Sequence, residues 1–415
     1  MCAARPLAKR PRLEADPDRR WAFVKHGIVR SLPSAARDDG AGAWWCATRV
    51  AAASSEGNAP SVFFAEDARV VSVTLPALEP GSVDTKVGKG DVVLPITSAP
   101  VAEQPRTIHE HAHAVQSVRI APASPSGVVD GNVLASSDRA GNVIVSTPQR
   151  PEGIRVAARP GELGWTGIAP CTSASGTHAC LARSLPRDLS LLDLNVAGDA
   201  CAARTIHTVH SPLALLQIPP LWTMAGGGAA YAVAEGSHLC LYDMRVGSSG
   251  GDRAEACVHR IACQGVQKIF CLGCPHAPGS LGAESAPAPI PPAAQSQEHG
   301  GVLAAGVGRG ATFWDCRTWR PLHRWSGLRQ AVCAMHFSHR RPGAVFVAGM
   351  SGEARLFSYG GSSKEKGRGG MKSKHEMLFS VDARWSGVAP YDAGRREAFV
   401  ARTVSGSFFH YVHNV

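Results

Sequence analysis

Seven similar segments recur along the chain, and each consists of two short β-type runs separated by a tight turn. The turns hold Gly, Asp, Ser or Pro, and the runs beside them are apolar, which is the pattern of a β-hairpin. The segments read SVFFAEDARVVSVTL, VLASSDRAGNVIVST, ACLARSLPRDLSLLDL, AAYAVAEGSHLCLYD, GVLAAGVGRGATFWD, AVFVAGMSGEARLFS and AFVARTVSGSFFHYV. Aligned at the end of the second strand, the equivalent residues are Val73, Ser146, Leu192, Tyr242, Trp314, Phe357 and Tyr411.

Each hairpin belongs to a longer unit. One more apolar strand precedes most hairpins, as in AVQSVRIAP and WTGIAPC, and a fourth strand can be placed between copies, as in PLHRWSG. A unit of four strands that is repeated seven times is typical of a β-propeller. Seven blades of about 43 residues each need about 300 residues. The sequence therefore predicts an all-β fold: a single seven-bladed β-propeller with four-stranded antiparallel blades over residues 21–415.

The remaining residues fall outside the blades. We expect a flexible basic tail over residues 1–20 and disordered loop insertions at about 79–106, 275–300 and 359–375. The last unit ends in SFFHYVHN and lacks an outer strand, whereas AFVKHGIVRSL at 22–32 is β-like and precedes the first blade. We expect this N-terminal strand to close the ring, because closure removes a sheet edge that would otherwise invite aggregation.

Composition limits the class of protein. Hydrophobic residues make up 44% of the chain and charged residues 18%, which is enough apolar material for a sizeable core. No apolar run reaches the roughly 18 residues of a membrane span, and the N-terminus lacks the apolar region of a secretory signal. The 12 cysteines are therefore expected to stay reduced in the cytosol or nucleus. The net charge of +10 suits a nuclear protein or an acidic partner.

One blade carries the residues of a known repeat family. HEHAHAVQSVRIAP followed by VLASSDRAGNVIVST resembles a WD-repeat blade, with His111 at the histidine position, Ser136 on the second strand and Asp138 in the tight turn. The Trp-Asp pair itself stands at Trp314 and Asp315. The resemblance to the WD-repeat superfamily covers about residues 40–415 and implies a scaffold that binds other proteins. Ser146 stands where the family prefers Trp, so the usual network from histidine to tryptophan is expected to be incomplete there.

Motifs for enzyme chemistry are absent or misplaced. GMSGE around Ser351 lacks the final glycine of a nucleophile elbow, and GVGRGA at 306–311 leads into a strand where a dinucleotide-binding turn requires a helix. No phosphate-binding loop motif is present. We therefore expect no catalytic site and no cofactor.

Two groups of residues could bind a metal. Cys271 and Cys274 form one C-x-x-C pair, but zinc usually takes two such half-sites, and buried thiols explain the pair as well. His109, His111 and His113 alternate along one strand, although the repeat alignment already explains His111 as a structural histidine. The prediction is that neither group holds a metal.

Two consecutive blades end in Asp-x-Arg: Asp243 and Arg245 in one, and Trp314, Asp315 and Arg317 in the next. These endings resemble the box with which substrate receptors of cullin-4 ubiquitin ligases dock on their adaptor. An arginine on a rim presents a planar set of donors to a partner's carboxylates or carbonyls. The alternative is that each Asp-x-Arg closes its blade through an internal ion pair.

Basic residues outside the blades suggest a location. Lys9, Arg10, Pro11 and Arg12 form a short cluster that an import receptor could recognise, so we expect a nuclear or nucleocytoplasmic protein. The loop at 359–374 holds five more basic residues among glycines. It could contact phosphate, but no nucleic-acid-reading motif accompanies it, and direct nucleic-acid binding is not expected.

The leading functional hypothesis is a non-catalytic protein–protein interaction scaffold, in the more specific form a substrate receptor of a cullin-4 ligase. The alternative is a structural subunit of a nuclear assembly such as a pore, chromatin or RNA-processing complex. In either case we expect a monomeric propeller within a multiprotein complex, without a membrane partner.

Overall fold

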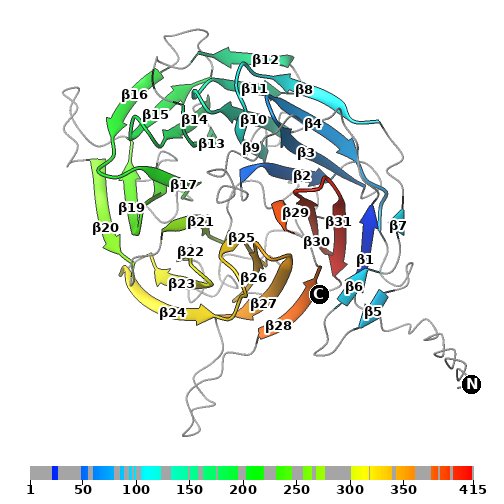
Figure 1. The fold of residues 1–415 in the computed structure, drawn as a ribbon. Helices are drawn as coiled ribbons and strands as arrows, with labels where there is room; N and C mark the ends of the chain where they lie inside the picture. Colours follow the sequence, from blue (N-terminus) through cyan, green and yellow to red (C-terminus); the bar gives the residue numbers. More distant parts are fainter. Residues whose placement is uncertain are drawn as a thin grey trace, which may run out of the picture.

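The computed structural model describes most of the blade residues. The described residues are 21–26, 48–54, 59–78, 85–87, 93–95, 98–99, 104–122, 132–147, 150–157, 161, 163–173, 176–194, 202–218, 230–244, 256–263, 268–275, 301–316, 318–338, 343–359, 375–381, 384–392 and 396–413. Their regular structure is β throughout, and the strands form seven antiparallel blades around a ring (Figure 1). Within these residues no helix has the length and apolar character to cross a membrane.

Blades one to four follow the chain order, with the first strand innermost. Blade one consists of β2 (Val50–Ser54), β3 (Pro60–Glu66), β4 (Arg69–Thr74) and β8 (Arg106–Glu110). Blade two consists of β9 (Val115–Pro122), β10 (Asn132–Asp138), β11 (Val143–Thr147) and β12 (Arg150–Val156). Blade three consists of β13 (Thr166–Ser173), β14 (Gly176–Arg183), β15 (Asp188–Asp193) and β16 (Ala202–His207). Blade four consists of β17 (Pro212–Gln217), β18 (Ala230–Glu235), β19 (His238–Asp243) and β20 (Cys257–Ala262).

Blades five to seven complete the ring. Blade five consists of β21 (Ile269–Gly273), β22 (Val302–Val307), β23 (Gly310–Asp315) and β24 (Arg320–Ser326). Blade six consists of β25 (Val332–Phe337), β26 (Ala344–Gly349), β27 (Glu353–Ser358) and β28 (His375–Ser380). Blade seven consists of β29 (Trp385–Asp392), β30 (Glu397–Thr403), β31 (Phe408–His413) and β1 (Trp21–His26). The prediction of a seven-bladed propeller with four-stranded blades is confirmed.

The N-terminal strand closes the ring, as the sequence predicts. β1 pairs antiparallel with β31 over its whole length, from Trp21 opposite His413 to His26 opposite Phe408. Blade seven thus takes three strands from the end of the chain and one from its beginning. The pairing satisfies backbone groups that would be exposed at an open sheet edge.

The range 79–106, expected to be a loop insertion, contains three short strands. β5 (Thr85–Val87) and β6 (Val93–Pro95) form a hairpin, and β6 pairs parallel with β28 at the outer edge of blade six. β7 (Ser98–Ala99) pairs parallel with β1 at the outer edge of blade seven. These stretches therefore add strands to two blades. The other two expected insertions lie largely outside the described residues, as does the tail at 1–20.

The core is divided among the blade interfaces. Seven clusters of buried apolar side chains occur in the described structure, and each joins two neighbouring blades. Large aromatic side chains such as Phe313 and Phe357 are fully buried between blades five and six. The seven aligned third-strand residues, Val73 to Tyr411, are all buried, which explains why an apolar residue recurs there. Each blade is held by its neighbours, so the ring is a rigid support for its loops.

Candidate functional site

The antiparallel blades give the ring two faces with different loops. The turns between second and third strands lie at the same end as the connections that lead from one blade into the next; we call this end the turn face. The connections between first and second strands, and between third and fourth strands, lie at the other end, which we call the opposite face. This division decides which candidate residues can act together.

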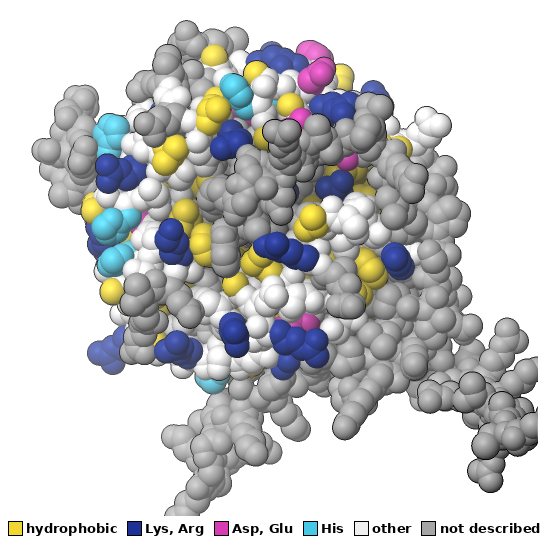
Figure 2. Space-filling model, in the orientation of Figure 1, with side chains coloured by type: hydrophobic (Ala, Val, Ile, Leu, Met, Phe, Trp, Pro, Cys, Tyr) yellow, Lys and Arg dark blue, Asp and Glu magenta, His cyan; other side chains and the backbone are white. Residues whose placement is uncertain are grey.

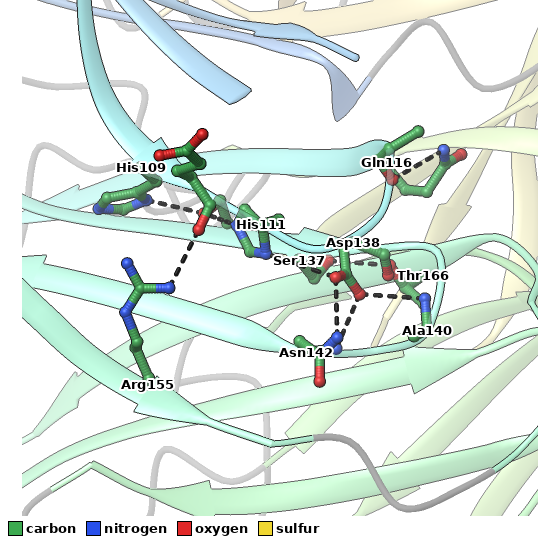
Figure 3. A network of polar contacts seen from close by, with 12 residues as sticks. His109, His111, Gln116, Ser137, Asp138, Ala140, Asn142, Arg155 and Thr166 are labelled. Atoms are coloured by element: carbon green, nitrogen blue, oxygen red, sulfur yellow. Dashed lines mark hydrogen bonds and ion pairs between the residues drawn. The ribbon is translucent and has the colours of Figure 1, made fainter. Parts of the chain in front are cut away.

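A buried polar network lies at the turn face of blade two (Figure 3). His111, in the connection from blade one, places Nε2 2.8 Å from Ser136 Oγ and Nδ1 3.7 Å from Asp138 Oδ2. Asp138 accepts hydrogen bonds from the Ala140 amide (3.0 Å) and from the Asn142 amide (2.9 Å) and side chain (2.8 Å). The structure therefore brings together the three residues that the WD-repeat resemblance singles out, and the network joins the entering loop to the turn.

The environment of Asp138 keeps its carboxyl group charged. Burial by itself would raise the pKa of Asp138, but the contact with the His111 ring and the hydrogen bonds from Asn142 outweigh burial and lower it. Thr166, the first residue of β13, donates a hydrogen bond of 2.7 Å to the Asp138 carbonyl oxygen and thereby links the network to blade three. Ser136 and Asp138 have no exposed surface. Because a nucleophile must reach its substrate, this His-Ser-Asp arrangement supports the turn and is not a hydrolytic triad.

His109 makes the contacts at the end of this network, where Ser146 stands in place of the family's tryptophan. Its Nδ1 lies 2.7 Å from Ser136 Oγ, and its Nε2 lies 2.9 Å from Ser146 Oγ. Burial lowers the pKa of His109 to about 4, with smaller contributions from His111 and Arg155, so its ring is neutral near pH 7. The usual network is incomplete in blade two, as expected, because Ser146 stands in place of the tryptophan. A second histidine, His109, connects Ser136 with Ser146 instead. Sequence reasoning considered His109 only as part of a metal triplet; its alternation with His111 was the available signal.

Other blades secure the turn face with different carboxylates. In blade four, Glu235 accepts hydrogen bonds from the Val209 and His210 amides at 3.1 and 2.9 Å, and Tyr242 donates its hydroxyl to the other carboxylate oxygen. In blade six, Glu353 accepts from the Arg329 amide. Both glutamates are buried, and each connects an entering loop to the blade it enters. The sequence analysis missed them because their spacing does not match the repeat motif.

The two Asp-x-Arg endings lie on the opposite face. Asp243 ends β19 and Asp315 ends β23, so both stand at the same end of the third strand in adjacent blades. Trp314 is buried between blades four and five, which gives it a role in packing. Arg245 and Arg317 lie outside the described residues, as do Lys9, Arg10, Pro11 and Arg12 of the expected import signal. The structure thus places Asp243 and Asp315, the aspartates of the two endings, on adjacent blades of one face.

Exposed apolar side chains gather on the turn face. Six large apolar residues of the described structure are well exposed, and four of them stand in turns or entering loops of this face: Leu163 (42%), Leu185 (46%), Val209 (48%) and Val404 (62%). The first three flank blade three: one precedes β13, one lies in the turn between β14 and β15, and one follows β16. We call Leu163, Leu185 and Val209 the blade-three patch.

Two basic residues accompany the blade-three patch. Arg187 is exposed in the same turn as Leu185, and its carbonyl oxygen accepts a hydrogen bond of 2.7 Å from the Thr208 amide beside Val209. His210 is exposed next to Val209. Lys and Arg side chains are spread over the view in Figure 2, where Asp and Glu side chains are few. A patch of this composition is suited to an apolar segment with acidic flanks.

The cysteines of the suspected metal pair lie in the interior. Cys263, Cys271 and Cys274 are buried, and burial raises the pKa of Cys263 to about 11 and that of Cys271 to about 12. Cys271 and Cys274 pack in different apolar clusters. No group of three or more potential metal ligands occurs in the part of the chain that the structure describes. Ser351 lies in the turn between β26 and β27, where its hydroxyl contacts Glu353 at 3.3 Å.

Comparison with known proteins shows the fold and leaves the function open. No family model matches the chain, and no curated protein matches it. Among solved structures, a chain in the crystal structure of the mitotic checkpoint complex is similar, with a TM-score of 0.58 and 12% sequence identity, over 99% of this chain and 98% of that chain. A likeness at this identity concerns the fold alone. The chain is a seven-bladed β-propeller.

Proposed function

We propose that this protein is a non-catalytic scaffold of the WD-repeat type that binds other proteins. The blade-three patch is the observation that carries the proposal: three large apolar side chains stand exposed around one blade of a rigid ring, beside Arg187 and His210. Exposed apolar residues grouped in this way are characteristic of binding surfaces. The His-Ser-Asp network of blade two supports assignment to the WD-repeat superfamily.

Substitution within the patch tests the binding role. Leu185→Glu combined with Val209→Glu places negative charge where an acidic-flanked apolar segment would bind. Leu322→Glu is the matched control, because Leu322 is equally exposed (51%) but lies on the outer strand β24. Affinity purification followed by mass spectrometry should show partners lost from the double variant and kept by the control. Identical partner sets for all three proteins would contradict the proposed surface.

The more specific form of the proposal is a substrate receptor of a cullin-4 ubiquitin ligase. It rests on the two Asp-x-Arg endings, whose aspartates Asp243 and Asp315 stand on adjacent blades of the opposite face. The adaptor would then bind the opposite face and the substrate the turn face. Arg245→Ala with Arg317→Ala should abolish co-purification of the ligase adaptor, whereas Arg150→Ala on β12 should leave it unchanged. Adaptor binding by the double variant at the wild-type level would refute this form.

The alternative is a permanent structural subunit of a nuclear assembly, in which the Asp-x-Arg arginines are internal. Size-exclusion chromatography of native extract separates the two hypotheses, since a permanent subunit should leave no free pool. Nuclear import through Lys9, Arg10 and Arg12 is tested by substituting all three with Ala in a fluorescent fusion. A fusion that still accumulates in the nucleus would remove the basis for that localisation signal.

A further inference from the structure

A cavity lies at the centre of the ring, where the first strands of all seven blades meet. Its lining includes residues of β2, β9, β13, β17, β21, β25 and β29. Most of the lining side chains are apolar, among them Leu216, Phe270, Met335 and Phe337. The cavity is separate from the blade-three patch and from the Asp-x-Arg endings.

Strand pairing defines one layer of this cavity. In each blade the aligned third-strand residue pairs with the second strand, and the following second-strand residue pairs with the first strand. The seven first-strand residues found in this way are Ala51, Arg119, Ala169, Leu216, Gly273, His336 and Ala389. All seven line the cavity. Four of them are Ala or Gly, and their small side chains leave space around the long Arg119.

Arg119 is the one Lys, Arg, Asp or Glu among the described residues that line the cavity. Its guanidinium makes no hydrogen bond or ion pair with any other residue that the structure describes. Arg119 is half-buried. Burial lowers the pKa of its guanidinium, and the nearby Cys271, on blade five, offsets part of this effect. Blades two and five are separated by two blades on one side of the ring and three on the other (Figure 1). Arg119 therefore directs its charge into the cavity.

A guanidinium carries five N–H donors and stays protonated in proteins. A cation held in apolar surroundings without a partner is costly, and an anion that fills the space removes that cost. The second titratable residue of the layer, His336, stacks on Phe346 and meets Phe399 edge-on, at ring-centroid distances of 6.2 and 5.6 Å, and these contacts extend the apolar wall. The cavity thus offers a ligand one planar, positively charged guanidinium within a mostly apolar lining.

We propose that the central cavity binds a small carboxylate with an apolar body, whose carboxylate pairs with Arg119. The two oxygens of a carboxylate match the planar donors of a guanidinium. The aliphatic or aromatic part of the ligand lies against Leu216, Met335 and Phe337. The ring would in this way hold a small ligand at its axis while its faces bind proteins.

Isothermal titration calorimetry on the full chain tests the proposal with three probes: hexanoate, 1-hexanol and inorganic phosphate. Hexanoate has both the charge and the apolar body, whereas each of the other probes has only one of them. The variant Arg119→Met keeps the length of the side chain without its charge, and Arg119→Lys keeps the charge without the fork. Arg150→Met on the outer strand β12 is the matched control, and circular dichroism verifies that each variant is folded.

Wild type and Arg150→Met should bind hexanoate with the same affinity, and Arg119→Met should bind it about tenfold or more weakly, as expected for loss of a charge-assisted hydrogen bond. The affinity for 1-hexanol should not change. Methyl resonances of labelled methionine locate the site, since hexanoate should shift the signal of Met335, assigned through Met335→Leu. No binding of hexanoate to wild type, equal binding by Arg119→Met, or phosphate binding as tight as hexanoate binding would each overturn the proposal. Should Arg119→Met fail to fold, weaker hexanoate binding by Arg119→Lys supports the proposal and undiminished binding opposes it.

Discussion

In blades two and four, a buried carboxylate connects the entering loop to the blade at the turn face, but the residues differ. In blade two, Asp138 ends the second strand and is contacted by the His111 ring from the entering loop. In blade four, Glu235 ends the second strand and accepts the entering loop's amides directly, while Tyr242 donates from the third strand. The longer glutamate reaches the backbone without an intervening histidine. The requirement common to both is a buried carboxylate that is fully hydrogen-bonded.

The largest expected effect comes from removing the blade-two carboxylate. Asp138→Ala leaves the Ala140 and Asn142 amides without their acceptor and removes the contact with the His111 ring, so it should lower the free energy of unfolding by about 4 kcal/mol. Urea denaturation measures the loss. Asn142→Ala, which removes one side-chain donor, should cost about 1 kcal/mol and serves as the control. A loss below that of Asn142→Ala would show that blade two does not depend on its carboxylate.

Mild acid should weaken blade two through His109. The pKa of His109 is lowered from 6.5 to about 4 in the folded protein, so the unfolded chain binds the proton first. The stability that comes from a neutral His109 is present above about pH 6.5 and is lost as the pH falls toward 4, by about 3 kcal/mol in total. Asp138, whose pKa is also lowered, stabilises the fold above the usual carboxyl pKa of about 3.9, so its contribution is lost only in stronger acid.

His109→Gln isolates this effect, because glutamine keeps polar atoms near both serines without titrating. Unfolding free energies of wild type and variant, measured from pH 7.5 to about 4.5, should converge as the pH falls. Parallel curves for the two proteins would show that His109 does not carry the pH dependence.

Ser146→Trp tests how His109 replaces the family's tryptophan. The indole would collide with the His109 imidazole, and overpacking of this kind costs about 2 kcal/mol. In the double variant with His109→Ala the indole gains the vacated space, so the two changes should cost less together than the sum of the single changes. A double-mutant cycle measures this coupling. Additive effects would mean that the two positions do not share one space.

The smallest effect is expected in blade four. Tyr242→Phe removes one donor from Glu235 but leaves the two amide donors in place, so the loss should be about 1.5 kcal/mol. Urea denaturation measures this loss, with Tyr359→Phe, in the aromatic cluster between blades five and six, as a control. A loss as large as that of Asp138→Ala would mean that the tyrosine, and not the loop amides, secures this glutamate.

The sequence was sufficient for the ring but not for its polar details. The seven hairpins and the missing outer strand of the last blade are local patterns, and they predict both the blade number and closure by β1. The role of His109 depends on a contact with Ser146, 37 residues away, which no local pattern encodes. Glu235 and Glu353 were missed because their spacing does not match the repeat motif. Within 79–106, strands β5 to β7 form by pairing with blades six and seven, so their existence depends on the folded ring.

The candidate site residues also fall into two groups: those that a sequence motif predicts and those that only the folded ring reveals. His111, Ser136 and Asp138 follow from the family motif and do come together. Arg119 does not stand out in AVQSVRIAP, because a single charge in an apolar strand becomes informative only when the other six first strands are seen around it. The blade-three patch joins an entering loop, a turn and the next connection, which are separated by more than 20 residues each.

The pairing of β1 with β31 has a consequence for how this protein is made. The two strands come from nearly opposite ends of the chain, and bringing them together costs about 5 kcal/mol of chain entropy if it precedes other contacts. During synthesis, β1 is made long before its partner β31, so the nascent protein exposes unpaired strand edges until β31 is available. We therefore expect its biogenesis to depend on chaperones that shield those edges, and a truncation that removes β31 to leave β1 without its partner strand.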